Sequence, residues 1–199
     1  MDTKQFLLTI CFFAVAFSAC KQANKIGSGD VRPIKDTLVD FASQRESQLE
    51  SLQRLKLDSI GQYLYNKYNL DPAIMFERFG KPVAAETSGV KNRHTNDRDF
   101  IYKYQLRDAS VAIYHATGSS RYLLSVLATS NMSQLSGFGI ITFMSPDSLR
   151  NLLGKENTIR DDEPKVLNLE YEIGEASNSL SFIFHNSKLD SIVFIPYLD

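Results

Sequence analysis

Alternating apolar and polar residues in the C-terminal half of the chain predict β-strands. The clearest case is residues 166–173, where Leu167, Leu169, Tyr171 and Ile173 alternate with polar residues. This period of two is typical of a strand with one buried face. Turn-forming clusters at residues 118–120 and 186–188 suggest antiparallel hairpins. The strands that we expect besides 166–173 are residues 100–106, 110–115, 122–128, 179–185 and 189–195, with a short one at 139–144.

A helical period precedes the strands. Apolar residues recur mostly three or four positions apart, at Leu38, Phe41, Leu49, Leu52, Leu55, Ile60, Leu64 and Tyr68. This spacing predicts an amphipathic helical segment over residues 37–70. It forms either one long helix or two with a break near residues 57–61, because Gly61 weakens a helix interior. We expect its C-terminal half to cover the folded domain and its N-terminal half to be solvated; a partner-binding or coiled-coil helix is the alternative.

Two short helices are predicted 74 residues apart. Asp71-Pro72 and Ser145-Pro146 are helix starts, since Asp or Ser accepts hydrogen bonds from first-turn amides and Pro fits the first helical position. Gly80 and Gly154 match helix ends, where a positive φ favours Gly. Each helix precedes a group of predicted strands. We therefore expect an α+β fold of two helix-then-antiparallel-sheet repeats, residues 71–130 and 131–199, preceded by the long helical segment.

This arrangement resembles a known family. The residues that carry the resemblance are Phe79-Gly80-Lys81-Pro82, Leu153-Gly154-Lys155-Glu156 and the final hairpin, residues 180–189. A capped helix ending in Gly-Lys-Pro before three strands resembles the SmpA/OmlA (BamE-like) lipoprotein domain. Two such units in tandem resemble the β-lactamase-inhibitor-protein-like (BLIP-like) fold. The resemblance covers about residues 69–199 and implies a non-enzymatic envelope protein that binds other proteins.

The N-terminus has the pattern of an export signal. Lys4 precedes an apolar run, residues 6–17, which is shorter than the roughly 20 residues that span a membrane. Phe17-Ser18-Ala19-Cys20 resembles the bacterial lipobox, in which the Cys becomes acylated. We expect a signal peptide over residues 1–19, lipidation of Cys20, a flexible tether over 20–36 and a periplasm-facing, outer-membrane location. A plain signal peptide or a buried N-terminal helix are the alternatives.

Composition and charge narrow the function classes. The chain has 199 residues and a formal net charge of −1, which does not suggest a nucleic-acid-binding protein. Its two Cys residues, Cys11 and Cys20, both lie near the N-terminus. The folded part therefore has no Cys for a disulfide or a Cys-based metal site. We find no catalytic signature and expect neither a metal nor a cofactor.

Candidate binding residues lie on one predicted strand and on two charged loops. Tyr102 and Tyr104 share a face and could anchor a protein partner on an open sheet. Arg93 and His94 belong to a basic loop, and Asp161 and Asp162 to an acidic one. Such loops are usually only solvated; attraction between the two loops and an interaction rim are the alternatives.

The leading hypothesis is therefore a membrane-tethered, non-enzymatic lipoprotein whose sheet binds a protein. An inhibitor or immunity protein against an enzyme or toxin is the first alternative. A small-ligand carrier or a hydrolase is the second, and a large apolar pocket with convergent polar groups would favour it.

Overall fold

A computed structural model describes residues 34–92, 94–163, 165–174 and 178–198. The chain divides into two compact units, residues 1–41 and 42–199. Within the first unit, only the start of a helix is described. The predicted signal peptide, the lipidation site Cys20, most of the tether and Arg93 lie outside the described residues. No described helix is long and apolar enough to cross a membrane.

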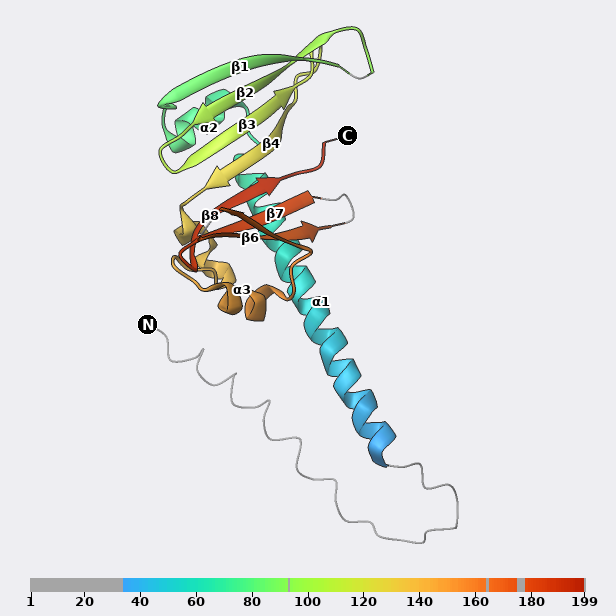
Figure 1. The fold of residues 1–199 in the computed structure, drawn as a ribbon. Coiled ribbons are helices and arrows are strands. Elements are labelled where there is room, and N and C mark those ends of the chain that lie inside the picture. Colours follow the sequence, from blue (N-terminus) through green and yellow to red (C-terminus); the bar gives the residue numbers. More distant parts are fainter. Residues whose placement is uncertain (1–33, 93, 164, 175–177, 199) are drawn as a thin grey trace, which may run out of the picture. The chain divides into compact units, whose positions relative to one another are not determined.

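The second unit is built around one antiparallel sheet of eight strands, shown in Figure 1. Its order is β1-β2-β3-β4-β8-β7-β6-β5. The strands are β1 (Ala84–Lys91), β2 (Arg98–Gln105), β3 (Ala109–His115), β4 (Tyr122–Thr129), β5 (Thr158–Glu163), β6 (Val166–Ile173), β7 (Asn178–His185) and β8 (Lys188–Ile195).

The expected fold of two helix-then-sheet repeats is wrong, because the strands form a single sheet. β4 pairs with β8 through Leu127–Phe194, Ala128–Val193 and Thr129–Ile192, so hydrogen bonding continues across the expected boundary at residue 130. The expected BLIP-like division into tandem units is corrected accordingly. The sequence pattern showed where most strands lie but contained no information on which strands pair.

Two strands were not predicted, and one predicted strand is absent. β1 and β5 lie at the two edges of the sheet and are rich in polar residues, so neither shows a clear period of two. Residues 139–144 follow a 3-10 helix, η1 (Met132–Phe138), and form turns instead of a strand. Phe143 has a φ of 64°, in the left-handed region, which a β-strand does not tolerate.

The helices of the second unit contribute buried side chains to a core on one face of the sheet, which we call the helix-side face. The register places buried side chains of the central strands on this face, in one continuous core with the helices. We call the other side the open face. The core residues that the strands contribute to the helix-side face include Val111, Ile113, Leu124, Leu127, Leu169, Tyr171, Leu180, Phe182, Phe184, Ile192 and Phe194.

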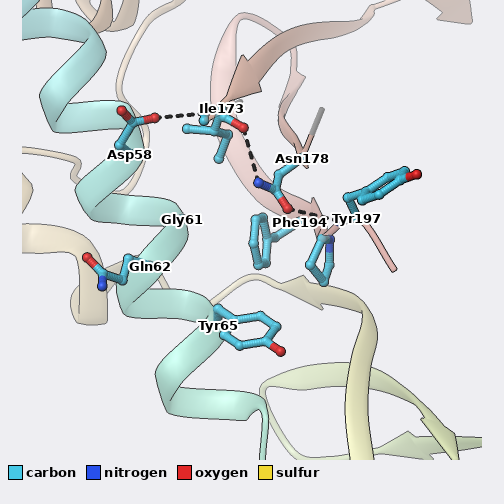
Figure 2. Close-up of a pocket in the computed structure, with 10 residues that line it drawn as sticks. Asp58, Gly61, Gln62, Tyr65, Ile173, Asn178, Phe194 and Tyr197 are labelled. Atoms are coloured by element: carbon cyan, nitrogen blue, oxygen red, sulfur yellow. Dashed lines mark hydrogen bonds between the residues drawn. The ribbon is translucent and has the colours of Figure 1, made fainter. Parts of the chain in front are cut away.

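The long helix α1 (Ile34–Tyr68) is continuous through Gly61, so the alternative with a break is wrong. Leu57, Ile60, Leu64 and Tyr68 are buried against the sheet. A Cβ at Gly61 would lie 2.8 Å from Ile173 Cδ1, which shows how closely the helix approaches the strands. Asp58 Oδ1 also accepts a hydrogen bond from the Gly174 amide, at 2.9 Å (Figure 2). The glycine thus allows close packing rather than breaking the helix.

The two short helices begin and end at the predicted residues. α2 (Pro72–Phe79) is capped by Asp71, whose side chain accepts from the Ala73 amide at 2.8 Å. α3 (Pro146–Leu153) is capped by Ser145 Oγ, which accepts from the Ser148 amide at 3.2 Å. Gly80 and Gly154 both have a φ of 87°. Local capping chemistry therefore places both helices correctly.

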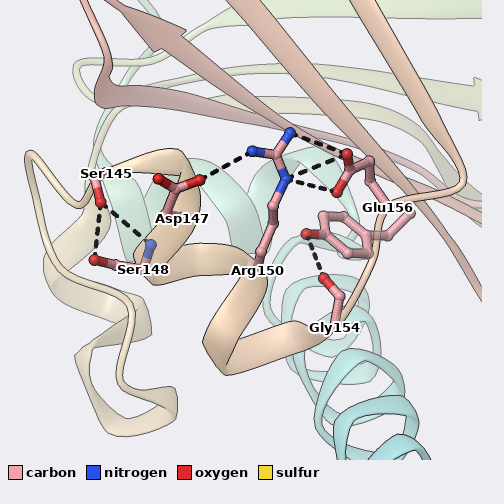
Figure 3. Close-up of polar contacts among 7 residues, drawn as sticks. Ser145, Asp147, Ser148, Arg150, Gly154 and Glu156 are labelled. Atoms are coloured by element: carbon pink, nitrogen blue, oxygen red, sulfur yellow. Dashed lines mark hydrogen bonds and ion pairs between the residues drawn. The ribbon is translucent and has the colours of Figure 1, made fainter.

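An ion pair fixes the chain after α3, as Figure 3 shows. Arg150 donates to both carboxylate oxygens of Glu156, with its Nε 3.0 Å from Oε2 and its terminal nitrogen 3.0 Å from Oε1. Only 4% of the Glu156 side chain is exposed, against 34% for Arg150. The Tyr171 hydroxyl donates to the Gly154 carbonyl at 3.2 Å. The hydrogen bonds from Arg150 hold the pKa of Glu156 below its usual range.

We predict that the C-terminal half of α1 carries its stabilising contacts. Leu64→Ala removes a fully buried side chain and should lower the free energy of unfolding by about 2–5 kcal/mol. Leu52→Ala is the matched control, because 63% of Leu52 is exposed. Its effect should stay within about 0.5 kcal/mol. Denaturant titration measures both changes. Equal decreases in the free energy of unfolding would show that the helix does not pack on the sheet as described.

We predict that the Arg150–Glu156 pair makes stability depend on pH. Since the folded pKa of Glu156 is lowered, the unfolded chain binds more protons, and stability rises with pH through the carboxyl range. Glu156→Gln should cost about 1–2 kcal/mol at pH 7, less than a fully buried pair because Arg150 is partly exposed. The difference from wild type should shrink below about pH 4. Chemical denaturation between pH 7 and pH 3 tests this, and a difference independent of pH would contradict it.

Candidate functional site

Five aromatic rings gather on the helix-side face at the β1–β4 end of the sheet. Phe100, Tyr102 and Tyr104 follow one another on one side of β2, with Tyr102 and Tyr104 parallel at 6.4 Å between ring centroids. Pairing of β2 with β3, and of β3 with β4, adds His115 and Tyr122, stacked at 4.5 Å. We call these five residues the aromatic platform.

Tyr102 lies at the centre of the aromatic platform. Its ring centroid is 6.3 Å from those of Phe100 and His115, and 6.4 Å from that of Tyr122. All five residues are half-buried. The rings therefore form a continuous aromatic surface of which part remains accessible.

α2 and the end of α1 contact the platform at Tyr104 and beside Tyr122. The ring of Phe76 on α2 meets Tyr104 edge-on at 4.9 Å. Asn69, just after α1, accepts a hydrogen bond from the Leu124 amide at 2.7 Å, next to the strand position of Tyr122. Burial raises the pKa of Tyr104, and the neighbouring phenols Tyr102 and Tyr122 add to this effect. The Tyr104 phenol thus stays neutral and able to donate.

On the opposite face of β2 and β3, the buried carboxylate of Asp99 holds the two strands together through hydrogen bonds. Asp99 is fully buried and accepts from the Tyr114 hydroxyl and, at 2.9 Å, from the Thr117 amide. These bonds lower the pKa of Asp99, and the bond to Asp99 raises that of Tyr114. They tie β2 to the end of β3 and the following turn. The backbone beneath the platform is therefore held in one arrangement.

The platform combines two kinds of binding chemistry. Its ring faces offer apolar area, and the hydroxyls of Tyr102, Tyr104 and Tyr122 have no hydrogen-bond partner among the residues that the structure describes. Tyrosine rings lose little conformational freedom on binding, which is why they are frequent at protein interfaces. The arrangement fits apolar side chains accompanied by backbone hydrogen-bonding groups.

The predicted site residues fall into separate places. Tyr102 and Tyr104 share a face as expected, but it is the helix-side face. His94 lies in the loop between β1 and β2, where its amide donates to Asn92 Oδ1 at 2.7 Å. Asp161 and Asp162 belong to β5, at the opposite edge of the sheet; their side chains lie outside the described part. The structure does not bring the basic and acidic loops together.

The predicted binding residues did not include three members of the platform and one neighbouring cation. Phe100 could have been found, because it continues the alternation of Tyr102 and Tyr104. His115 and Tyr122 join only through the strand register, which the sequence does not give. Arg98 also lies on β2, and its side chain crosses Gly89 of β1, where a Cβ would lie 1.9 Å from Arg98 Nε. Gly89 thus makes room for Arg98.

A separate groove of about 410 Å³ lies between α1 and the ends of β6–β8 (Figure 2). Tyr65, Ile173 and Phe194 provide its apolar walls. Two of its polar side chains already have partners: Asp58 accepts from the Gly174 amide, and Asn178 donates to the Ile173 carbonyl and accepts from the Tyr197 amide, at 3.1 and 2.8 Å. These groups stabilise the fold, which leaves them less available to a ligand.

Within the described ranges, no group of three or more His, Cys, Asp or Glu side chains could hold a metal ion. Comparisons with protein families, with curated proteins and with solved structures found no match for this chain.

Proposed function

We propose that this protein is a lipid-anchored, non-enzymatic protein of the bacterial cell envelope that binds another protein. The aromatic platform is the observation that carries the binding part of this proposal. Four of its rings surround Tyr102 at centroid distances of 6.3–6.4 Å. Interfaces concentrate their binding energy in such aromatic residues.

Two further features support protein binding over a small-molecule site. The platform is a surface and not an enclosed cavity, and its half-buried rings are spread over three strands. In the groove beside α1, in contrast, the side chains of Asp58 and Asn178 are already hydrogen-bonded within the fold. The motifs that resemble SmpA/OmlA lipoproteins point in the same direction. An inhibitor or immunity role is a special case of the same binding.

The envelope location is proposed from the Phe17-Ser18-Ala19-Cys20 motif. Cys20→Ala should prevent acyl labelling and shift the protein from the membrane fraction to the soluble fraction of bacterial cells, because the lipid is the proposed anchor. Cys11→Ala is the matched control, since Cys11 lies inside the apolar run, and it should leave both unchanged. Unaltered fractionation of Cys20→Ala would remove the anchor from the proposal.

Photo-crosslinking from the platform tests the binding. A benzoylphenylalanine at position 102, in membranes from cells, should give a discrete protein adduct after irradiation. The matched control is the same group at Lys103, which neighbours Tyr102 on β2, points to the opposite face and is exposed. Tyr122→Ala should weaken the adduct, because it removes a ring from the platform. Adducts only from position 103 would move the binding surface to the open face, and none from either would contradict the proposal.

A further inference from the structure

β1 ends the sheet with a regular, unpaired outer edge. All eight of its residues, Ala84–Lys91, pair with β2 in one unbroken register. No other described strand lies on its outer side. The strand contains neither a proline nor a bulge. A regular edge of this length is a template for pairing with another extended chain.

The outward hydrogen-bonding groups of β1 can be assigned. The Asn92 amide donates inward to the Asp97 carbonyl at 3.1 Å. Since successive residues of an antiparallel strand bond to alternate sides, Ala85, Thr87 and Gly89 direct their amide and carbonyl groups outward. Their register partners are Tyr104, Tyr102 and Phe100, so their side-chain positions lie on the same face as the aromatic platform. The free edge and the platform adjoin.

The other edge of the sheet differs in ways that block pairing. β5 has an irregular register between Arg160 and Glu163, and its sequence from 160 to 163 is entirely charged. Bulges and charged residues are the usual means of protecting an edge strand. On β1 only Glu86 and Lys91 are charged, and Glu86 lies 3.8 Å from Lys103 on the open face. The chain protects one edge and leaves the other available.

Side-chain size and charge at β1 define what would fit there. Ala85, Thr87 and Gly89 are small, so an added strand could lay larger side chains across them toward the platform. Arg98 lies over Gly89, is exposed, and has no ion-pair partner among the described residues. A second copy of β1, paired with the same face on the same side, would present these small residues and Lys91, with no carboxylate for Arg98.

We propose that β1 accepts an extended segment of the partner protein as a ninth strand. The segment carries apolar side chains at alternate positions, which pack over Ala85 and Thr87 against Tyr102 and Tyr104. It places a carboxylate at the position facing Gly89, where it pairs with Arg98. Backbone hydrogen bonds to the outward groups provide affinity, and the side chains provide selectivity. This inference deepens the proposed function and rests on it.

Labelled synthetic peptides and edge variants of the full chain test the inference. The probe has eight residues, with Val at three successive alternate positions, Glu at the fourth, and Ser or Thr between them. The comparison probe has Lys in place of Glu. Thr87→Pro removes one outward amide without removing a bond to β2, because proline is tolerated at such edge positions. Thr87→Val is the matched control. Ala85→Pro, at a second outward amide, is used if circular dichroism shows that Thr87→Pro does not fold.

Fluorescence anisotropy should show that wild type and Thr87→Val bind the Glu probe equally. Thr87→Pro should weaken binding at least about tenfold, since it prevents continuous pairing along the edge. Wild type should favour the Glu probe over the Lys probe by about threefold, and Arg98→Glu should reverse this preference. Unchanged binding to the proline variants, or no binding of the Glu probe to wild type, would overturn the inference.

Two outcomes separate this inference from others. If wild type is a dimer by light scattering, becomes a monomer with Thr87→Pro and ignores both probes, the occupant of the edge is a second copy. If Thr87→Pro leaves the crosslink from position 102 intact, strand addition is wrong but protein binding by the platform stands. Loss of both the crosslink from position 102 and probe binding in Tyr104→Ala, with the fold retained, supports one continuous site.

Discussion

The sheet depends on the way α1 crosses the junction between β4 and β8. Only three residue pairs join these two strands, whereas most neighbouring pairs share six to eight. α1 contacts both sides of this short junction. At Gly61 it approaches the sheet so closely that an added Cβ would lie 2.8 Å from Ile173 and 3.6 Å from Phe194. About two turns later, just after the helix ends, Asn69 accepts a hydrogen bond from the Leu124 amide of β4 at 2.7 Å. The helix therefore holds together two groups of strands that share few backbone hydrogen bonds.

This role of α1 explains which parts of the fold could be predicted from the sequence. Helices α2 and α3 follow from local chemistry at Asp71, Gly80, Ser145 and Gly154, and each lies where that chemistry places it. The single sheet depends instead on contacts between residues about 67 positions apart, such as Leu127 with Phe194. A period of two identifies which face of a strand is buried, but it does not show which other strand that strand pairs with. Helix propensity predicts that Gly61 weakens α1. In the structure, Gly61 instead lets the continuous helix pack closely against the sheet.

The candidate site was also predictable only in part, because some of its residues meet through strand pairing. Tyr102 and Tyr104 lie on one strand two residues apart, so their common face follows from strand geometry alone. His115 and Tyr122 come to Tyr102 only through the registers of two hairpins. Arg98 takes its place because Gly89, on a strand that was not predicted, leaves the space open. Edge strands are the hardest to predict, since neither face must be fully apolar.

The concentration of these features at one edge is what gives the proposed binding its physical basis. An aromatic surface alone would bind many apolar groups with little selectivity, and a free strand edge alone would pair with any extended chain. On β1 and β2 the two occur together, with the small residues Ala85 and Thr87 between the free edge and the rings. Arg98 then adds a charge that distinguishes one extended segment from another. The buried bonds of Asp99 keep the strands in place, so little ordering of the site would be required when a partner binds.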